Sequence, residues 1–295
     1  MTNQKPFRFG LATGKGSSRT AWRDKARLAE DLGYDILLMP DHVTTDLAPI
    51  AALAVAAEAT STLRIGSLVF DNDFRHPALL AREAATLDLL SEGRFELGLG
   101  AGYELEDYTQ TGIPFDPPAV RVSRLEEALL IIQRFFTQEM VDFSGQHYTI
   151  TGLRGLPRPV QQPYPPIFLG GQGKRLLSLG ARLADSLGLG FQSYADAQGK
   201  LAPTAPEEVE EKITWIRQAA GERFGQLELG YTLFYVQMTD RSVHVPLNFH
   251  AVIGSREQII DELLERRARY GLSYVQVTDE YRDLFAPVVA RLAGK

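Results

Sequence analysis

An aspartate and a histidine stand side by side after an apolar run, in LLMPDHV at residues 37–43. A histidine exchanges a proton near neutral pH, so His42 is a candidate for proton transfer. Neighbours on a strand face opposite ways, so only one of Asp41 and His42 can point straight at a ligand. The pair therefore predicts either catalysis by His42 or a cap of the following loop, satisfied by backbone groups.

A glycine-rich turn is the second candidate site, in FLGGQGKRLLSL at residues 168–179. Glycines let the backbone approach a ligand closely, and the free N–H groups of a helix start suit a phosphate. An ordinary tight turn between a strand and a helix is the alternative. The candidate phosphate-binding residues are Gly170, Gly171, Gln172, Gly173, Lys174 and Arg175.

A third stretch, GLGAGY at residues 98–103, has glycines at three alternate positions. Because they clear one face of a strand, a flat ring could lie against the backbone there, close to Ala101 and Gly102. The alternative is a close contact with a helix or a corner of the sheet, which also uses glycine in a strand.

Several kinds of chemistry are disfavoured by what the sequence lacks. There is no cysteine, so a thiol nucleophile or thiolate metal site is excluded. The five histidines show no metal-binding spacing, so no metal is expected. No Gly-x-Ser-x-Gly motif is present, which weakens acyl transfer.

The elements that must position these residues alternate between short apolar runs and longer amphipathic ones. We expect strands at 7–12, 35–39, 63–70, 94–100, 167–171, 185–191, 227–238 and 274–278. We expect helices at 18–32, 49–60, 77–90, 121–136, 174–183, 206–220, 255–270 and 280–292. Strict alternation and apolar strands predict a parallel sheet covered on both faces.

The fold class predicted from this order is α/β, a (β/α)8 TIM barrel formed by residues 1–295 as one domain. A doubly wound open sheet is the alternative; the barrel is favoured because no Gly-x-Gly-x-x-Gly follows the first strand. Asp41 and His42 would then lie at the C-terminal mouth. Lid or insertion segments are expected at about 101–120, 137–166, 192–205 and 239–254, with a small hairpin in VDFSGQHYTI at 141–150.

Composition restricts the cellular setting. With 295 residues, 44% hydrophobic and a formal net charge of −6, the chain has a globular composition and no nucleic-acid footprint. No segment has the roughly 18 to 20 apolar residues that span a bilayer, and the start does not follow the plan of a signal peptide. We therefore expect a cytoplasmic protein without membrane or nucleic-acid partners.

Four stretches together resemble the bacterial luciferase-like flavin and deazaflavin oxidoreductases, in the branch that uses coenzyme F420. They are LMPDH (38–42), RHPALLAREAATLDLLSEGRFELGLGAG (75–102), RVSRLEEALLII (121–132) and PPIFLGGQGKRLLSLGARLAD (165–185). The resemblance runs from Phe7 to about Val277.

The resemblance implies roles for individual residues. His42 matches the proton-transfer residue beside the cofactor ring, and Asp41 matches an acid that contacts the ring. A non-proline cis peptide that supports the back of the deazaflavin is expected at Leu68–Val69. The turn at 170–175 matches the family's phosphate site.

One departure concerns the substrate. Family members that oxidise sugar phosphates carry a glutamate directly after the alternating glycines of residues 98–102, where this chain has Tyr103. Their substrate-phosphate lysines and arginines have no clear counterpart either, so Tyr103 is expected to line a pocket for another, apolar organic substrate.

The leading hypothesis is hydride transfer between coenzyme F420 (F420H2 when reduced) and an organic, apolar small-molecule substrate. The first alternative is a monooxygenase that uses FMN, supplied as FMNH2 by a separate flavin reductase, together with O2. The second alternative is a non-catalytic flavin-binding protein. The family implies a homodimer, and the aromatic residues expected to contribute to an apolar pocket are Phe115, Tyr148, Phe191, Tyr194 and Phe249.

Overall fold

The structure is a computed structural model that describes residues 5–191, 203–240 and 248–295. Its main sheet has the strand order β3-β2-β1-β13-β10-β9-β8-β5-β4, and β3 also pairs with β5. Strands β3 and β4 are two parts of one barrel strand, because both pair with β5. The fold is therefore a closed eight-stranded parallel barrel with helices between the strands, as predicted.

Two compact units divide the chain, and two of the boundaries between them fall within strands. Unit 1 comprises residues 1–13, 28–37 and 170–295, and unit 2 comprises residues 14–27 and 38–169. Strands β2 (Ile36–Met39) and β8 (Ile167–Gly171) and helix α1 (Arg19–Asp31) contribute residues to both. That residues 1–295 form a single domain stays a prediction.

Unit 1 contains four parallel strands of the barrel with buried, apolar side chains. Strand β13 (Leu272–Thr278) pairs with β1 (Arg8–Ala12) and with β10 (Glu228–Leu233), which pairs with β9 (Ser186–Leu189). The helices of this unit are α6 (Lys174–Leu183), α7 (Pro206–Ala220), α8 (Arg256–Tyr270) and α9 (Arg282–Leu292), with the 3-10 helices η2 (Gly221–Gln226) and η3 (Asp279–Tyr281).

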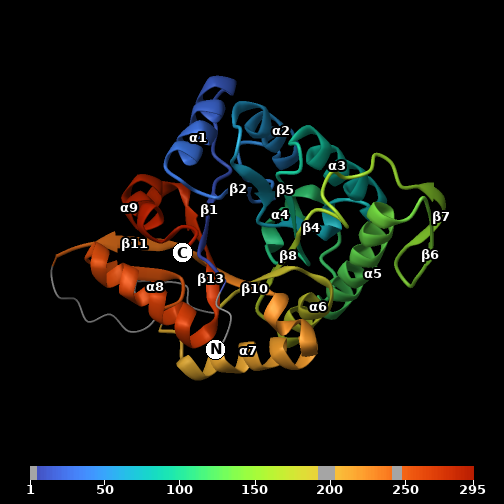
Figure 1. Cartoon of the computed structure of the whole chain (residues 1–295). Helices are drawn as coiled ribbons and strands as arrows, with labels where there is room; N and C mark the ends of the chain where they lie inside the picture. The colour runs from blue at the N-terminus through green and yellow to red at the C-terminus, as the bar shows by residue number, and fades with distance from the viewer. Residues whose placement is uncertain (1–4, 192–202, 241–247) are drawn as a thin grey trace. The chain divides into compact units, whose positions relative to one another are not determined.

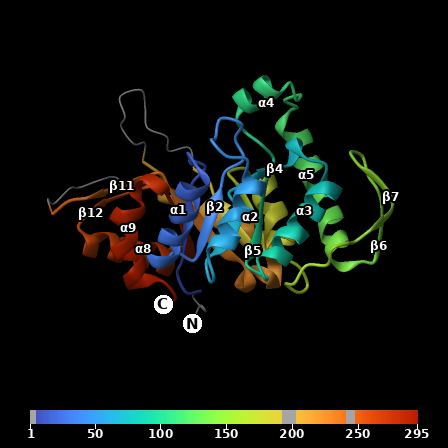
Figure 2. The same cartoon turned by 90° about the horizontal axis from the view of Figure 1, so that it is seen from above.

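Unit 2 contains the strand ends that carry the aspartate–histidine pair and the alternating glycines. Its strands β3 (Arg64–Ser67) and β4 (Phe70–Asp71) pair with β5 (Phe95–Gly100), which pairs with β8. Helices α2 (Pro49–Ala59), α3 (Pro77–Leu90) and α5 (Pro118–Thr137) lie side by side in both views (Figures 1 and 2). The unit also includes η1 (Asn72–Phe74) and a short helix, α4 (Leu105–Thr111).

The expected hairpin is present in unit 2 as β6 (Met140–Ser144) and β7 (Thr149–Arg154). It lies beside α5 in both views (Figures 1 and 2). Glu127 of α5 accepts the backbone N–H groups of Gln146, His147 and Tyr148 at 2.6, 2.9 and 3.1 Å. Burial raises the pKa of the Glu127 carboxyl, but the three hydrogen bonds together outweigh it and lower the pKa. One carboxylate thus fixes the hairpin turn to the helix.

The predicted strand at 227–238 is wrong as one continuous element. Strand β10 ends at Leu233, and a separate strand, β11 (Tyr235–Met238), pairs with β12 (Ala251–Gly254) outside the barrel. The change occurs at Phe234, which is 48% exposed, whereas β10 is almost wholly buried. The loop predicted at 239–254 therefore contains a strand, and its residues 241–247, like 192–202 of another predicted lid, lie outside the described part of the chain.

No helix within the described residues is long and apolar enough to cross a membrane.

Candidate active site

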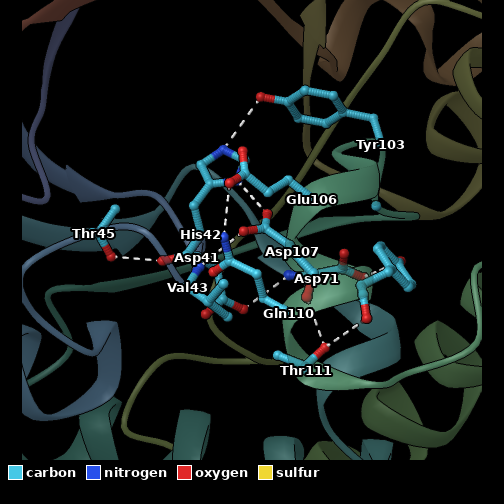
Figure 3. Close-up of polar contacts among 12 residues, drawn as sticks. Asp41, His42, Val43, Thr45, Asp71, Tyr103, Glu106, Asp107, Gln110 and Thr111 are labelled. Atoms are coloured by element: carbon cyan, nitrogen blue, oxygen red, sulfur yellow. Dashed lines mark hydrogen bonds and ion pairs between the residues drawn. The ribbon is translucent and has the colours of Figure 1, made fainter.

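His42 lies at the centre of a short chain of hydrogen bonds in unit 2 (Figure 3). Its Nδ1 is 2.6 Å from Oδ2 of Asp107, and its Nε2 is 3.2 Å from the Tyr103 hydroxyl. The rings of His42 and Tyr103 meet edge to face with centroids 5.6 Å apart. The imidazole is thus fixed at both nitrogens, which suits a group that passes a proton along one line.

Asp107 decides which nitrogen of His42 carries the proton. A carboxylate only accepts hydrogen bonds, so Nδ1 must carry a hydrogen, and in neutral His42 Nε2 accepts the Tyr103 O–H. The other oxygen of Asp107 accepts the N–H of Val43 at 3.0 Å, and its side chain is 4% exposed. This buried carboxylate therefore sets both the tautomer and the orientation of the ring.

Asp107 was missed by the sequence reasoning, which singled out no residue between Tyr103 and Phe115. It belongs to α4, a helix of seven residues in a stretch expected to be a loop. The available signal was only an aspartate between Glu106 and Tyr108 in the acidic and polar stretch ELEDYTQT. Its pairing with His42 joins residues 65 positions apart, so no local pattern could reveal it.

Asp41 ties the segment after β4 to the end of β2. The two terminal nitrogens of the Arg75 guanidinium donate to the two carboxylate oxygens of Asp41, Nη2 at 2.8 Å. The backbone N–H of Asp71 donates to Oδ2 of Asp41 at 3.0 Å. The side chain is 6% exposed. The geometry therefore supports the structural role left open for one member of the pair, and contact between Asp41 and a cofactor ring stays a prediction.

The Leu68–Val69 peptide bond is cis, at the position that the resemblance indicates. The N–H of Leu68 donates to the carbonyl of Met39 at 2.8 Å. Leu68 and Val69 are half-buried and interrupt the strand between β3 and β4, which is why the predicted strand at 63–70 is two strands. Their contact with a cofactor stays a prediction.

A neighbouring group of unit 2 occupies the space beside each of the three alternating glycines, Gly98, Gly100 and Gly102. A Cβ on Gly98 would lie 1.9 Å from the carbonyl oxygen of Ser67, and one on Gly100 would lie 2.6 Å from Cγ2 of Val69. Gly102, at φ +72°, leaves the space occupied by the Tyr108 hydroxyl and the Asp71 carboxylate. This favours the close-contact interpretation of the glycines, and cofactor binding by Ala101 and Gly102 stays a prediction.

Behind Gly102 lies a buried acidic network. The Tyr108 hydroxyl donates to Asp71 and Asp73, each at 3.1 Å, and Arg124 forms ion pairs with Asp73 at 2.8 Å and with Asp116. Burial raises the pKa of the Asp71 carboxyl to about 6, because removal from water disfavours its charged form. This network supports the loop that carries Tyr103 and Asp107.

Asp71→Asn should make the protein more stable relative to wild type as pH rises. The folded state holds the Asp71 proton up to about pH 6, whereas the unfolded chain loses it near 3.8, so this group weakens folding as pH passes through that window. The amide cannot ionise and keeps an oxygen for Tyr108 and for the N–H of Asp73. We expect the difference in unfolding free energy to rise by about 1–3 kcal/mol from pH 4 to pH 7.5 in urea titrations; a difference independent of pH would contradict this.

The glycine-rich turn belongs to unit 1 and joins β8 to α6. Gly173 and Lys174 are exposed, and a Cβ on Gly173 would meet nothing within 4 Å. From α7, the buried Lys212 donates to the carbonyl of Gln172 at 2.9 Å, an anchor that the sequence did not indicate. The turn is thus held at Gln172 and open at the start of α6. Phosphate binding stays a prediction for Gly170, Gly171, Gln172, Gly173, Lys174 and Arg175.

The aromatic residues expected around an apolar pocket have mixed positions. Phe191 and Phe249 are 1% and 0% exposed and pack on each other with ring centroids 5.1 Å apart, so they belong to the core of unit 1. Tyr148 contacts Asn72 and His76 in unit 2, and Phe115 is 38% exposed beside Tyr108. Tyr194 lies outside the described residues. Among the described residues, no group of three or more His, Asp or Glu side chains could hold a metal ion.

Comparison with known proteins gives curated relatives with clear sequence similarity. The chain is 31% identical over 194 residues to the F420-dependent glucose-6-phosphate dehydrogenase of Amycolatopsis mediterranei (strain U-32). The match covers 62% of this chain and 57% of that relative, so it spans little more than half of the relative's length.

Two solved structures share the fold across almost the whole chain. The coenzyme F420-dependent tetrahydromethanopterin reductase from Methanopyrus kandleri superposes with a TM-score of 0.79 at 16% identity, covering 98% of both chains. A long-chain alkane monooxygenase superposes with a TM-score of 0.79 at 14% identity, covering 98% of this chain and 91% of the other. At these identities the likeness concerns the fold alone.

The family model described as luciferase-like monooxygenase matches residues 5–236, which is most of the chain. That match includes the strand ends bearing Asp41 and His42, the cis bond and the glycine-rich turn. The chain belongs to the luciferase-like monooxygenase family.

Proposed function

We propose that this chain is an oxidoreductase that transfers a hydride between coenzyme F420 and a small, apolar organic substrate. The observation that carries the proposal is the imidazole of His42, held in one tautomer by a buried carboxylate at the mouth of a barrel strand. Hydride transfer to or from an organic substrate is accompanied by a proton, and such a histidine can supply or remove it. The F420-dependent relative supports the choice of cofactor.

The residues of each unit suit the part of the cofactor that the family resemblance assigns to them. When bound, the deazaflavin would supply or accept the hydride, while the protein orients it and keeps the proton at His42. In unit 2, Val43, Tyr103 and Leu105 are 42%, 67% and 56% exposed, and this apolar surface beside His42 suits a flat ring or an apolar substrate. In unit 1, the open start of α6 offers N–H donors and the side chains of Lys174 and Arg175 to an anionic tail.

The charges around His42 argue against a phosphorylated substrate. Residues 101–117 contain four acidic residues and no lysine or arginine. In the same unit, Arg75 is paired with Asp41, Arg124 with two aspartates, and Arg121 donates to the carbonyl of Gly102 at 2.9 Å. An anionic phosphate beside His42 would therefore lack an available partner among these arginines, so we infer an uncharged substrate.

Cofactor titrations under anaerobic conditions test this proposal. We expect fluorescence quenching of F420 on binding, and F420H2 consumption with an uncharged ketone or enone, with acetone and cyclohex-2-enone as probes. Glucose 6-phosphate should not be oxidised. Tight FMNH2 binding, followed by O2 consumption once oxygen is admitted, would instead support the two-component monooxygenase, for which the alkane monooxygenase with the same fold is the precedent. Binding of either cofactor without turnover of any probe would support the non-catalytic alternative.

Asp107→Asn should lower turnover about 10- to 100-fold, as loss of a partner that orients an active group typically does. The amide can donate to Nδ1, so the ring no longer holds its proton at one nitrogen. Asp107→Glu, which keeps a carboxylate, should restore part of the rate. The affinity for F420, measured by fluorescence quenching, should change little in both variants. Equal rates for Asp107→Asn and wild type would show that Asp107 does not orient His42 for turnover.

A further inference from the structure

We propose that Tyr103 is the group that exchanges a proton with the substrate, and that His42 reloads it. This rests on the proposed function, because it assigns the proton that accompanies the hydride. The three residues are arranged in order of increasing exposure: the Asp107 side chain is 4% exposed, the His42 side chain 31%, and Tyr103 67%. Tyr103 is therefore the outermost member of the chain in Figure 3.

The hydrogen bonds of His42 define two states of this relay. In neutral His42, Nε2 accepts the Tyr103 O–H across 3.2 Å, so that hydrogen points inward. When His42 is protonated, Nε2–H becomes the donor and the Tyr103 oxygen accepts, which turns the O–H outward. Asp107 retains the Nδ1 hydrogen in both states and balances the charge of the imidazolium.

The proton and electron balance closes with reduced deazaflavin as the hydride source. In reduction of a C=O or an activated C=C bond, the hydride forms a C–H bond and the π electron pair moves to the far atom. That atom, or the oxygen conjugated with it, takes the Tyr103 proton, and Nε2–H of His42 protonates the phenolate. His42 ends neutral and takes up a proton from solvent before the next turnover; oxidation of an alcohol runs the same steps in reverse.

The neighbouring charges favour this assignment. Among the described residues, Asp107 and Tyr103 are hydrogen-bonded to the His42 ring, and Asp41, Asp71 and Glu106 are the other acids labelled in Figure 3. Asp41 is held by Arg75, and Glu106 accepts from Gln110 at 2.7 Å. Asp107 is therefore the acid that balances the charge of a proton on His42, and His42 can act as the reserve of protons.

NMR on the wild-type protein tests the relay without any substrate. Tyrosine labelled with 13C at Cζ reports the phenol, and 15N-labelled histidine reports the imidazole; spectra of Tyr103→Phe and His42→Gln assign the two signals. In a pH titration we expect the Tyr103 signal to shift with the same midpoint as the His42 signal, and to lose this step in His42→Gln. Tyr235, whose hydroxyl donates to Gln237 at 3.1 Å, is the internal control and should show no such step.

Kinetics then test the transfer to substrate. With the ketone or enone that wild type reduces, Tyr103→Phe should lower kcat about 100-fold, within the range for loss of a general acid, and change KM little. The solvent deuterium isotope effect on kcat should also differ between Tyr103→Phe and wild type. The relay is contradicted if the chemical shift of Tyr103 does not change as His42 titrates, or if Tyr103→Phe has an unchanged kcat.

These outcomes separate the relay from the proposed function. Coupled Tyr103 and His42 signals without F420 binding would leave the relay standing and reject the cofactor. F420 binding and turnover without coupling would keep the oxidoreductase and reject the relay. Tyr103 is exposed, so Tyr103→Phe is expected to unfold at the wild-type temperature, which a thermal melt verifies.

Discussion

His42→Gln should reduce turnover by about 10²- to 10⁴-fold while leaving F420 bound, because a positioned acid–base group contributes that much to a rate. The amide side chain keeps polar atoms near Asp107 and Tyr103 but cannot exchange a proton at neutral pH. Stopped-flow measurement of F420H2 oxidation with the probe ketone or enone gives the rate, and fluorescence quenching gives the affinity. The fall should appear in kcat rather than in the dissociation constant.

His76→Asn is the matched control for this substitution. His76 is an exposed residue at the start of α3 whose ring accepts the N–H of Ala78 at 3.3 Å, and asparagine is a good residue for that helix cap. We expect its turnover to stay near wild type. If both variants lose the same activity, the loss reports general damage; if His42→Gln keeps full turnover, His42 is not the acid–base group.

Gly102→Ala should cost about 2–4 kcal/mol of unfolding free energy and most of the activity, combining strain at positive φ with a steric clash. The new Cβ would lie 2.0 Å from the Tyr108 hydroxyl and 2.4 Å from the Asp71 carboxylate. Tyr108 is 1% exposed and bonded to two aspartates, so it cannot move without breaking the acidic network. Urea unfolding followed by circular dichroism measures the loss.

Gly112→Ala separates backbone strain from the clash. Gly112 has the same φ of +72° at the end of α4, but a Cβ there meets nothing within 4 Å. Its cost should be about 1–2 kcal/mol, the penalty for a left-handed alanine alone. Equal losses in the two variants would show that the space behind Gly102 adjusts freely.

The barrel was predictable because most of its strands and helices have a strong local pattern. The elements at Ile167–Gly171, Lys174–Leu183 and Pro206–Ala220 have the predicted bounds, since glycine and proline mark most of their ends. The cis bond at Leu68–Val69 followed from family resemblance and from no property of those two side chains.

What the sequence did not reveal depends on contacts between distant residues or on short elements. Helix α4 has seven residues, too few for an amphipathic period to stand out, and it carries Asp107. The alternating glycines predicted a cleared face, but Ser67, Val69 and Tyr108 fill that space, and only the tertiary structure shows this. His42 was identifiable from its place after a strand, whereas its two partners in the relay were not assigned to it.

The packing behind β5 also determines where this protein can be redesigned. Positions 98, 100 and 102 admit no side chain, so libraries that aim at new reactivity gain nothing from randomising them. Val43, Leu105 and Phe115 present their side chains to solvent and tolerate exchange on physical grounds. Altered selectivity should therefore be sought by varying those three sites together while the glycines at 98, 100 and 102 are kept.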